Sequence, residues 1–224
     1  MTGLFKWSGG AIFVASLAVC LWCYVFVFGA RRPWMGWTPF VFDALLITVF
    51  AMHHSVFARS GVKERMTREI PEPLLRSVYV WIASALFIAV CVLWQPVGGE
   101  LYSSPGWLAI VHAFVQLGGI AVIAQSVRAI DPLELAGIRP PSGRDGLQIG
   151  GPYRLVRHPL YFGWVLATFG AAHMTGDRLA FAVLTSLYLA IAIPWEERSL
   201  VAVFGDAYRR YQRQVRWRMI PFIY

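Results

Sequence analysis

Two pairs of charged residues lie where apolar segments of the chain begin and end, and their types suit catalysis or ligand binding. Arg157-His158 directly precedes one apolar segment, and Glu196-Glu197 directly follows the next. Charged side chains at the border of a membrane are energetically costly, so a cluster of them indicates a functional site. A guanidinium, an imidazole and two carboxylates can together bind a ligand of mixed charge and move protons.

Each pair also has a structural interpretation, which the sequence leaves open. Arg157 and His158 precede a proline, which favours the first position of a helix, and their charges could simply stop that helix at the membrane surface. Glu196 and Glu197 oppose the helix dipole, and a salt bridge to Arg157 or Arg198 would offset that cost. In the functional interpretation, the helix start and Arg157 form an anion pocket, and a carboxylate binds a cation or a pair of hydroxyl groups.

Apolar segments must position these residues, because 58% of the chain is hydrophobic. Three of the segments contain no Asp, Glu, Lys or Arg over 23 to 27 residues, which is enough to cross a bilayer as a helix. The candidate spans are residues 7–30, 34–58, 77–99, 101–127, 159–176 and 179–195. The sequence predicts an all-α integral membrane protein with about six transmembrane helices, of which the last two form a short helical hairpin.

The 20 Lys and Arg residues are distributed unevenly between the two sides of this arrangement. Seventeen lie near the two chain ends or in and beside the loops 59–73 and 128–157, whereas Arg31, Arg32 and Arg178 lie on the other side. The positive-inside rule therefore predicts that both termini and the active site are cytoplasmic.

We expect a single membrane domain over residues 1–224, with a four-helix part (1–127) and a cofactor-binding part (128–224). The loop 128–157 is longer than an ordinary connection, which suggests a lid, a re-entrant segment or a binding loop. After residue 195, apolar residues recur in steps of three and four opposite an arginine-rich face, which predicts a C-terminal amphipathic helix. That helix would lie in the membrane interface or close an aromatic stripe over a ligand.

The composition argues against several other functions. The net charge of +8 is explained by topology and by anionic lipid headgroups, so we expect membrane lipids and no nucleic acid as partners. Cys20 and Cys23 have the spacing of a metal or redox pair, but no second pair completes four ligands, so no metal site is expected. The sequence leaves the oligomeric state open.

Three histidines, His53, His54 and His112, lie inside predicted spans. Intramembrane histidine is a functional candidate by default, and hydrogen bonding between helices is the ordinary alternative. One interpretation is that His54 approaches the acceptor of a reaction, as a base or a hydrogen-bond donor. Metal or haem ligation by His53 or His54 with His112 is a further alternative, which no nearby set of carboxylates or thiolates supports.

Antiparallel packing of the last two spans would place both charged pairs at the same membrane surface. Four tyrosines could join them in one pocket: Tyr153, Tyr161, Tyr208 and Tyr211. Such a pocket suits a zwitterionic, cationic nucleoside such as S-adenosylmethionine, whose carboxylate could bind arginine or a helix start. Its ammonium and ribose hydroxyl groups could bind glutamate, and its adenine could stack on aromatic rings.

The C-terminal part resembles a known family. Residues 151–163 (Gly-Pro-Tyr-Arg-Leu-Val-Arg-His-Pro-Leu-Tyr-Phe-Gly), Glu196-Glu197 and residues 204–211 (Phe-Gly-Asp-Ala-Tyr-Arg-Arg-Tyr) resemble the C-terminal signature of the isoprenylcysteine carboxyl methyltransferase family. The resemblance implies that seven residues line an S-adenosylmethionine pocket: Tyr153, Arg157, His158, Tyr161, Glu196, Glu197 and Tyr208. If the tail adds a basic contact, we expect it from Arg210 or Arg213.

The first half is similar to a bacterial branch of that family, typified by methanethiol S-methyltransferase. The similar segments are 54–59 (His-Ser-Val-Phe-Ala-Arg), 76–80 (Arg-Ser-Val-Tyr-Val) and 130–139. His53 stands where glutamine is expected in the thiol enzymes, and this departure bears on the acceptor rather than on the cofactor. The resemblance implies a bacterial inner-membrane protein.

The resulting hypothesis is an S-adenosylmethionine-dependent membrane methyltransferase that methylates a small or lipophilic thiol. The predicted catalytic residues are His54, His158 and Arg157, with His54 or His158 removing the thiol proton. One alternative is a carboxyl methyltransferase acting on a prenylated cysteine or another lipidic acceptor. An alternative from a different class is a non-enzymatic transporter or redox accessory protein.

Overall fold

The computed structural model describes residues 2–57, 60–139 and 146–224, which divide between two compact units. The N-terminal unit comprises Met1–Glu100, Asp131–Ser142 and Thr175–Ala180, and the C-terminal unit comprises Leu101–Ile130, Gly143–Met174 and Phe181–Tyr224. Residues 140–145, part of the predicted lid loop, lie outside the described residues.

Long apolar helices dominate both units. Among the described residues, five helices are long and apolar enough to cross a membrane: Gly3–Val27, Trp37–Phe57, Leu74–Val92, Gly106–Ile130 and Gly176–Phe204. Their length and composition support the predicted all-α membrane protein. A sixth crossing stays a prediction.

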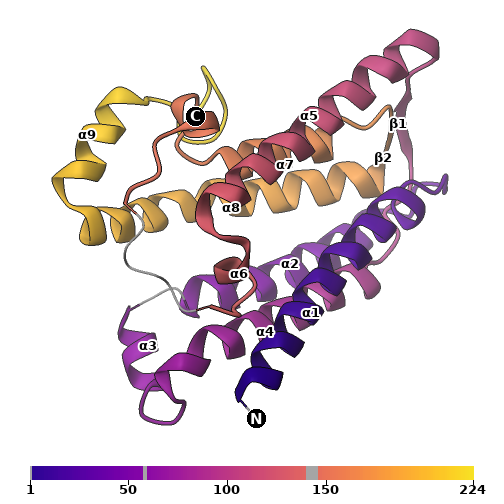
Figure 1. Cartoon of the computed structure of the whole chain (residues 1–224). Helices are drawn as coiled ribbons and strands as arrows, with labels where there is room; N and C mark the ends of the chain where they lie inside the picture. Colours follow the sequence, from indigo (N-terminus) through magenta and orange to yellow (C-terminus); the bar gives the residue numbers. More distant parts are fainter. Residues whose placement is uncertain (1, 58–59, 140–145) are drawn as a thin grey trace. The chain divides into compact units, whose positions relative to one another are not determined.

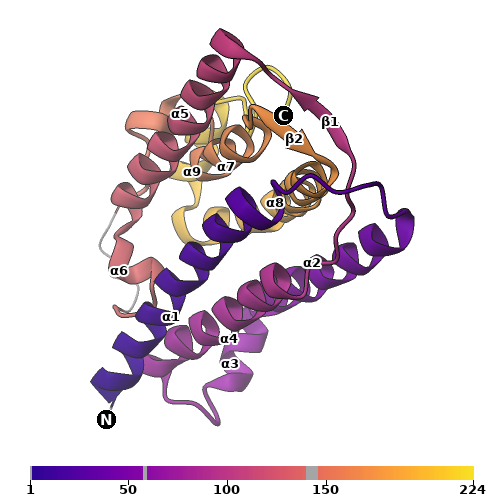
Figure 2. The same cartoon turned by 90° about the vertical axis from the view of Figure 1, so that its right-hand side faces the viewer.

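The N-terminal unit is built from α1 (Thr2–Trp22), α2 (Trp37–Phe57), α3 (Ser60–Met66), α4 (Glu72–Val92) and α6 (Pro132–Leu135). In this unit α4 packs against both α1 and α2 (Figures 1 and 2). A Cβ atom added at Gly9 of α1 would lie 3.0 Å from Cδ1 of Trp81 of α4, so glycine permits a close approach there. Ser77 of α4 donates a hydrogen bond to the Gly137 carbonyl oxygen at 2.6 Å, which attaches the segment after α6.

The first turn of α8 (Gly176–Phe204) fixes a loop of the N-terminal unit. Asp177, which is 2% exposed, accepts a hydrogen bond from the indole of Trp94 at 2.9 Å. Its carboxylate also accepts hydrogen bonds from the backbone N–H groups of Val97 and Gly98, at 2.8 and 3.0 Å. Three uncharged N–H groups thus supply the hydrogen bonds that this buried carboxylate needs.

In the C-terminal unit, α5 (Gly106–Ile130) and α7 (Pro159–Phe169) lie side by side (Figure 1). Gly119 and Gly163 face each other across this contact, and a Cβ atom at either would lie 2.6 Å from the carbonyl oxygen of the other. Small residues allow apolar helices to approach closely enough for backbone contact. The glycine pair therefore sets the distance between α5 and the first half of α7.

Side chains of α5 also form hydrogen bonds with backbone carbonyl groups at the end of α7. Gln116 donates a hydrogen bond to the Ala167 carbonyl oxygen at 2.9 Å, and Nδ1 of His112 lies 3.2 Å from the Gly170 carbonyl oxygen. The last carbonyl groups of a helix have no partner within it, and in an apolar environment they must bind elsewhere. Of the interpretations of His112, the structure thus favours hydrogen bonding between helices.

The predicted helical span over residues 159–176 is wrong in its second half. The helix α7 has 11 residues and is therefore about 16 Å long, roughly half of a hydrocarbon core of about 30 Å. After it, the strand β2 (His173–Thr175) pairs with the strand β1 (Glu100–Ser103). Pairing with a distant strand overrides the apolar composition that suggested a continuous helix.

The boundaries of the last predicted span are also wrong. Asp177, expected in a loop, lies in the first turn of α8, and this helix continues past residue 195 to Phe204. Gly205 then adopts a φ of +54°, a conformation that favours glycine, and separates α8 from α9 (Asp206–Gln214). The predicted amphipathic helix is therefore split between the end of α8 and α9.

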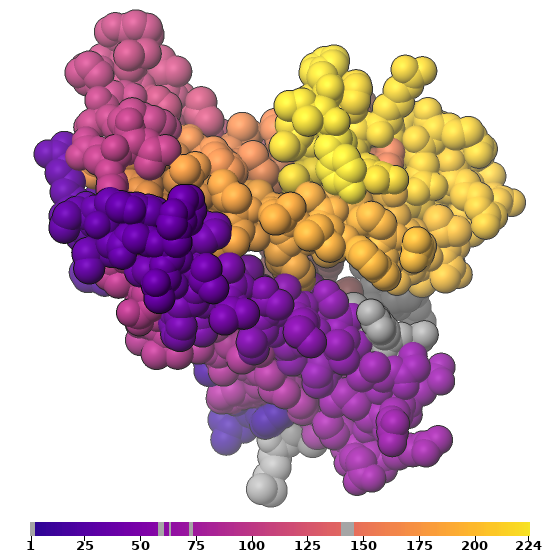
Figure 3. All heavy atoms as spheres, turned by 180° about the vertical axis from the view of Figure 1, so that it is seen from behind, coloured from indigo at the N-terminus to yellow at the C-terminus, as the bar shows by residue number. Residues whose placement is uncertain are grey.

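The C-terminal tail, residues 215–224, folds back on α8 (yellow against orange in Figure 3). The Tyr224 hydroxyl donates a hydrogen bond to the Ala190 carbonyl oxygen of α8 at 3.2 Å. On another side, the backbone N–H groups of residues 157 and 158 donate to the carbonyl oxygens of residues 217 and 218, at 2.9 and 2.8 Å. The tail thus joins the start of α7 to α8.

Candidate active site

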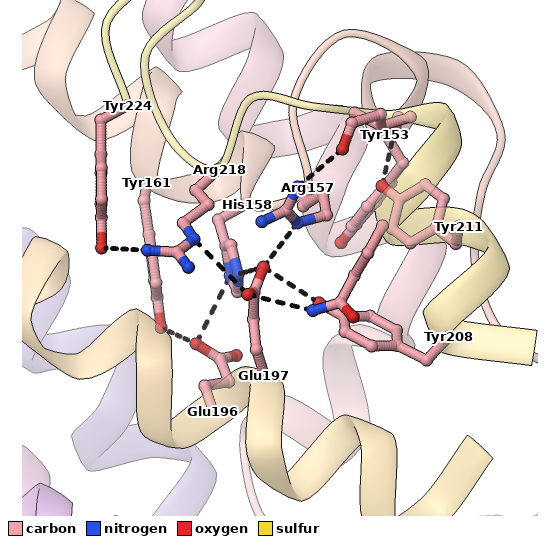
Figure 4. Close-up of polar contacts among 12 residues, drawn as sticks. Tyr153, Arg157, His158, Tyr161, Glu196, Glu197, Tyr208, Tyr211, Arg218 and Tyr224 are labelled. Carbon is pink, nitrogen blue, oxygen red and sulfur yellow. Dashed lines mark hydrogen bonds and ion pairs between the residues drawn. The ribbon is translucent and has the colours of Figure 1, made fainter. Parts of the chain in front are cut away.

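The carboxylate of Glu197 is the centre of a polar cluster between α7, α8, α9 and the tail (Figure 4). Glu197 is 5% exposed, and its Oε1 atom accepts a hydrogen bond from Nε of Arg157 at 2.5 Å. Its Oε2 atom accepts from Nε2 of Gln212 at 3.2 Å and lies 3.6 Å from Nε of Arg218. The Tyr208 hydroxyl donates to Oε1 at 3.4 Å. Buried charge is thus balanced by opposite charge and hydrogen bonds, as it must be.

Arg157 connects this carboxylate to the tail. It is 8% exposed, and Nη1 donates hydrogen bonds to the carbonyl oxygens of Val215 at 2.6 Å and Arg216 at 2.9 Å. Removing one partner of a buried ion pair leaves an uncompensated charge and costs about 3–5 kcal/mol. Arg157 and Glu197 therefore hold the site together as well as contributing charge to it.

His158 lies between the two glutamates. It occupies the N-cap position of α7, and its ring stacks on Tyr161 with the ring centroids 5.4 Å apart. Its Nδ1 lies 3.5 Å from Oε2 of Glu196, and its Nε2 lies 3.5 Å from Oε1 of Glu197. Within the described part of the chain, the buried Nε2 has no hydrogen-bond partner. Apart from the 3.5 Å ion-pair contact with Glu197, this nitrogen is free of protein partners among the described residues and could form a hydrogen bond to a bound molecule.

Glu196 differs from its neighbour because adjacent residues of a helix point about 100° apart. Its side chain is 44% exposed, whereas that of Glu197 is 6% exposed. The Tyr161 hydroxyl donates a hydrogen bond to Oε2 of Glu196 at 2.8 Å. Glu196 is therefore the carboxylate that a ligand can reach without breaking the buried ion pair.

Three tyrosines and Val215 form the core beside the cluster. The Tyr211 hydroxyl donates a hydrogen bond to the Tyr153 carbonyl oxygen at 2.7 Å. Burial, assisted by the nearby Glu196 charge, raises the pKa of Tyr153 to about 12, and burial likewise raises the pKa of Tyr208 and Tyr211. All three stay neutral at physiological pH, so Tyr208 and Tyr211 can donate hydrogen bonds, and all three rings pack in the core beside the cluster.

A cavity of about 340 Å³ opens beside Glu197. Its lining residues are Pro194, Glu197, Arg198, Val201, Gln212 and Arg218. Its lining therefore combines a carboxylate, an amide and guanidinium groups with the apolar side chains of Pro194 and Val201. This combination suits a ligand with both charged and apolar parts.

The structure brings together most of the residues predicted from the sequence. The residues found in the cluster or its core are Tyr153, Arg157, His158, Tyr161, Glu196, Glu197 and Tyr208. His54 belongs to the N-terminal unit, where its Nδ1 is hydrogen-bonded to the Tyr79 hydroxyl, and His53 stacks on the same tyrosine ring at 5.5 Å.

Two residues beside Glu197 were not predicted. Gln212 and Arg218 contact its carboxylate, whereas Arg210 and Arg213, from which a basic contact was expected, are exposed. Arg218 follows α9 in a segment without periodicity, so only the folding back of the tail shows its role. Within the described residues, no group of three or more His, Cys, Asp or Glu side chains is arranged to hold a metal ion.

Several known proteins are similar to most of this chain. It is 36% identical to the methanethiol S-methyltransferase of Crocosphaera subtropica, over 83% of this chain and 76% of the relative. It is 33% identical to the methanethiol S-methyltransferase of Pseudomonas deceptionensis, over 77% of this chain and 70% of the relative. It is 35% identical to that of Mycobacterium tuberculosis, over 78% of this chain and 75% of the relative. The chain belongs to the methanethiol S-methyltransferase family.

Residues 133–207 also match the phospholipid methyltransferase family, and this range contains most of the polar cluster. Membership of the methanethiol S-methyltransferase family confirms the resemblance seen in the sequence. Together with the five long apolar helices, it supports an integral membrane protein with methyltransferase activity. No solved structure matches the chain.

Proposed function

We propose that this chain transfers a methyl group from S-adenosylmethionine to a small thiol, at the cytoplasmic face of a bacterial inner membrane. The main support is the cluster around Glu197, which gathers accessible and buried charges of both signs beside a cavity. The methyltransferase relatives imply a methyl donor. S-adenosylmethionine carries both positive and negative charges, and the side chains of the cluster can pair with both.

Two observations indicate that the residues fit this cofactor. The 44% exposed side chain of Glu196 can accept hydrogen bonds from an ammonium or from ribose hydroxyl groups, and Tyr161 already fixes its position. The buried Nε2 of His158 makes no hydrogen bond of ordinary length among the described residues, its contact with Glu197 being 3.5 Å long, so a bound molecule could supply one. The buried ion pair of Glu197 and Arg157 would hold Glu196 and His158 in position.

The chain itself must orient the two reactants, exclude water and remove a proton. S-adenosylmethionine, when bound, supplies a methyl group on a positively charged sulfur. Charge is neutralised when a thiolate attacks such a sulfur, so apolar surroundings favour the reaction. A thiol must first lose its proton, and we assign this step to His158 Nε2 or to His54, whose Nδ1 is hydrogen-bonded to Tyr79.

A small thiol is the proposed acceptor because the similar proteins are named methanethiol S-methyltransferases. A lipidic carboxylate would need no base at neutral pH, because its carboxyl group is already ionised. A base near the acceptor is therefore a feature of the thiol hypothesis, and His158→Gln should lower turnover of a thiol at neutral pH.

The decisive experiment uses purified protein in detergent micelles and S-adenosylmethionine labelled in the methyl group. We expect saturable binding, followed by formation of labelled dimethyl sulfide when methanethiol is added. An Arg209→Gln variant, in which an exposed arginine of α9 is removed, should behave like the parent. Absence of saturable binding would contradict the enzyme hypothesis. Binding with transfer to a prenylcysteine analogue, and none to methanethiol, would contradict the thiol hypothesis.

A further inference from the structure

The structure distinguishes two arginines that contact Glu197. Arg157 is 8% exposed, and its Nε and Nη1 atoms are engaged by Glu197 and by two carbonyl oxygens of the tail. These bonds already occupy two of its three nitrogen atoms. It is therefore poorly placed to bind the carboxylate of a ligand directly.

Arg218 is the accessible cation of the pair. Its side chain is 38% exposed, its Nε lies 3.6 Å from Oε2 of Glu197, and it lines the cavity of about 340 Å³. Arg198 also lines this cavity, but its guanidinium lies over the ring of Trp195, 6.0 Å from the centroid.

Tyr224 holds Arg218 in position. The Tyr224 hydroxyl accepts a hydrogen bond from Nη1 at 3.2 Å, and the guanidinium lies over the Tyr224 ring, 5.2 Å from its centroid. The Arg218 backbone N–H donates to the Tyr224 backbone oxygen at 2.9 Å, and its own carbonyl oxygen accepts from the N–H of His158 at 2.8 Å. Both the backbone and the side chain of Arg218 are thus fixed before any ligand binds.

We propose that Arg218 binds the carboxylate of the methionine moiety of S-adenosylmethionine, and that Tyr224 is its positioning residue. This inference rests on the proposed function. A guanidinium matches the geometry of a carboxylate and binds it more strongly than a point charge does. The ammonium of the same moiety can then reach Glu196, so the two ends of the zwitterion bind groups of opposite charge.

The test compares two ligands by equilibrium binding to the purified full chain: S-adenosylmethionine and its decarboxylated analogue. Arg218→Gln should weaken binding of S-adenosylmethionine about tenfold or more, because a hydrogen-bonded charge pair is lost. It should change binding of the decarboxylated analogue about twofold at most. Tyr224→Phe keeps the ring and should give a smaller loss with the same dependence on the carboxylate.

Control variants separate this role from a structural one. Arg209→Gln removes an exposed charge and should affect neither ligand, and Arg218→Lys should recover only part of the lost affinity. Equal losses for both ligands in Arg218→Gln, or no loss, would overturn the proposal, as would a carboxylate-dependent loss in Arg198→Gln instead. If Arg218→Gln does not fold, Arg218→Lys and Tyr224→Phe decide the question by the same ratio. Failure of the parent protein to bind S-adenosylmethionine would instead reject the proposed function.

Discussion

The helix α8 carries two buried acids, Asp177 in its first turn and Glu197 near its end, and their surroundings differ in kind. Asp177 is 2% exposed and binds two backbone N–H groups and an indole. Glu197 is 5% exposed and is bound by long side chains, which include two arginines and a glutamine.

This difference explains why only one of the two acids belongs to a candidate site. Backbone donors are fixed by the fold, so the Asp177 carboxylate is fully committed to structure. The groups around Glu197 are side chains, an exposed carboxylate adjoins it, and a cavity opens beside it. A buried acid therefore indicates function less by its burial than by the type of groups that neutralise it.

The largest expected effect is that of Glu197→Ala. It leaves the guanidinium of Arg157 buried without its partner, which should lower the free energy of unfolding by about 3–5 kcal/mol. Denaturant titration in detergent micelles measures this loss. The double variant Arg157→Met/Glu197→Leu should recover most of the stability and none of the cofactor binding. A single variant as stable as the parent would show that Glu197 is not the structural centre of the cluster.

Asp177→Asn should give the next largest change, and only in stability. The amide replaces one acceptor oxygen by a donor that faces other donors, which should cost about 2–3 kcal/mol. The affinity of the folded protein for S-adenosylmethionine should stay within about twofold of the parent. A selective loss of affinity without loss of stability would remove the distinction between the two acids.

Glu196→Gln should give the opposite pattern. Its side chain is 44% exposed, so the free energy of unfolding should change by about 0.5 kcal/mol or less. Affinity for S-adenosylmethionine should fall about tenfold, because a charged hydrogen-bond acceptor is lost. Asp206→Asn, which neutralises an exposed acid of α9, is the matched control. Unchanged affinity in Glu196→Gln would place the cofactor elsewhere.

One expected effect is absent at neutral pH and emerges only at alkaline pH. The pKa of Tyr153 is raised to about 12, and those of Tyr208 and Tyr211 are also raised. Because the unfolded chain then loses these protons first, the tyrosine contribution to stability is complete below pH 10 and is lost as the pH rises toward 12. Thermal unfolding between pH 9 and about 11 measures it, and Tyr153→Phe should reduce the slope. Loss of the same size below pH 9 would exclude the tyrosines as its cause.

Part of this site could be predicted because charge and apolar length are local signals. Two neighbouring apolar segments with charges at their ends predict that residues 157–158 and 196–197 meet, and the ion pair between Arg157 and Glu197 shows that they do. Which glutamate is buried depends on how α8 is rotated against its neighbours. Because Glu196 and Glu197 are adjacent and of the same type, the sequence does not predict which of them is buried.

The remaining differences come from contacts between distant residues. An apolar run over 159–176 is compatible with a continuous helix, and only pairing with residues 100–103 converts its last part into a strand. Arg218 likewise depends on the return of the tail to α8 through Tyr224 and Ala190. Tertiary contacts of this kind override local propensity.

The tail has a practical consequence for producing the protein. Tyr224 is hydrogen-bonded to Ala190 and to Arg218, so anything fused directly behind it crowds the proposed binding surface. The opposite end of the chain offers an alternative attachment point, because no residue of the proposed binding site lies in α1. Purification handles and fluorescent reporters therefore belong ahead of α1, where they leave ligand affinity undisturbed.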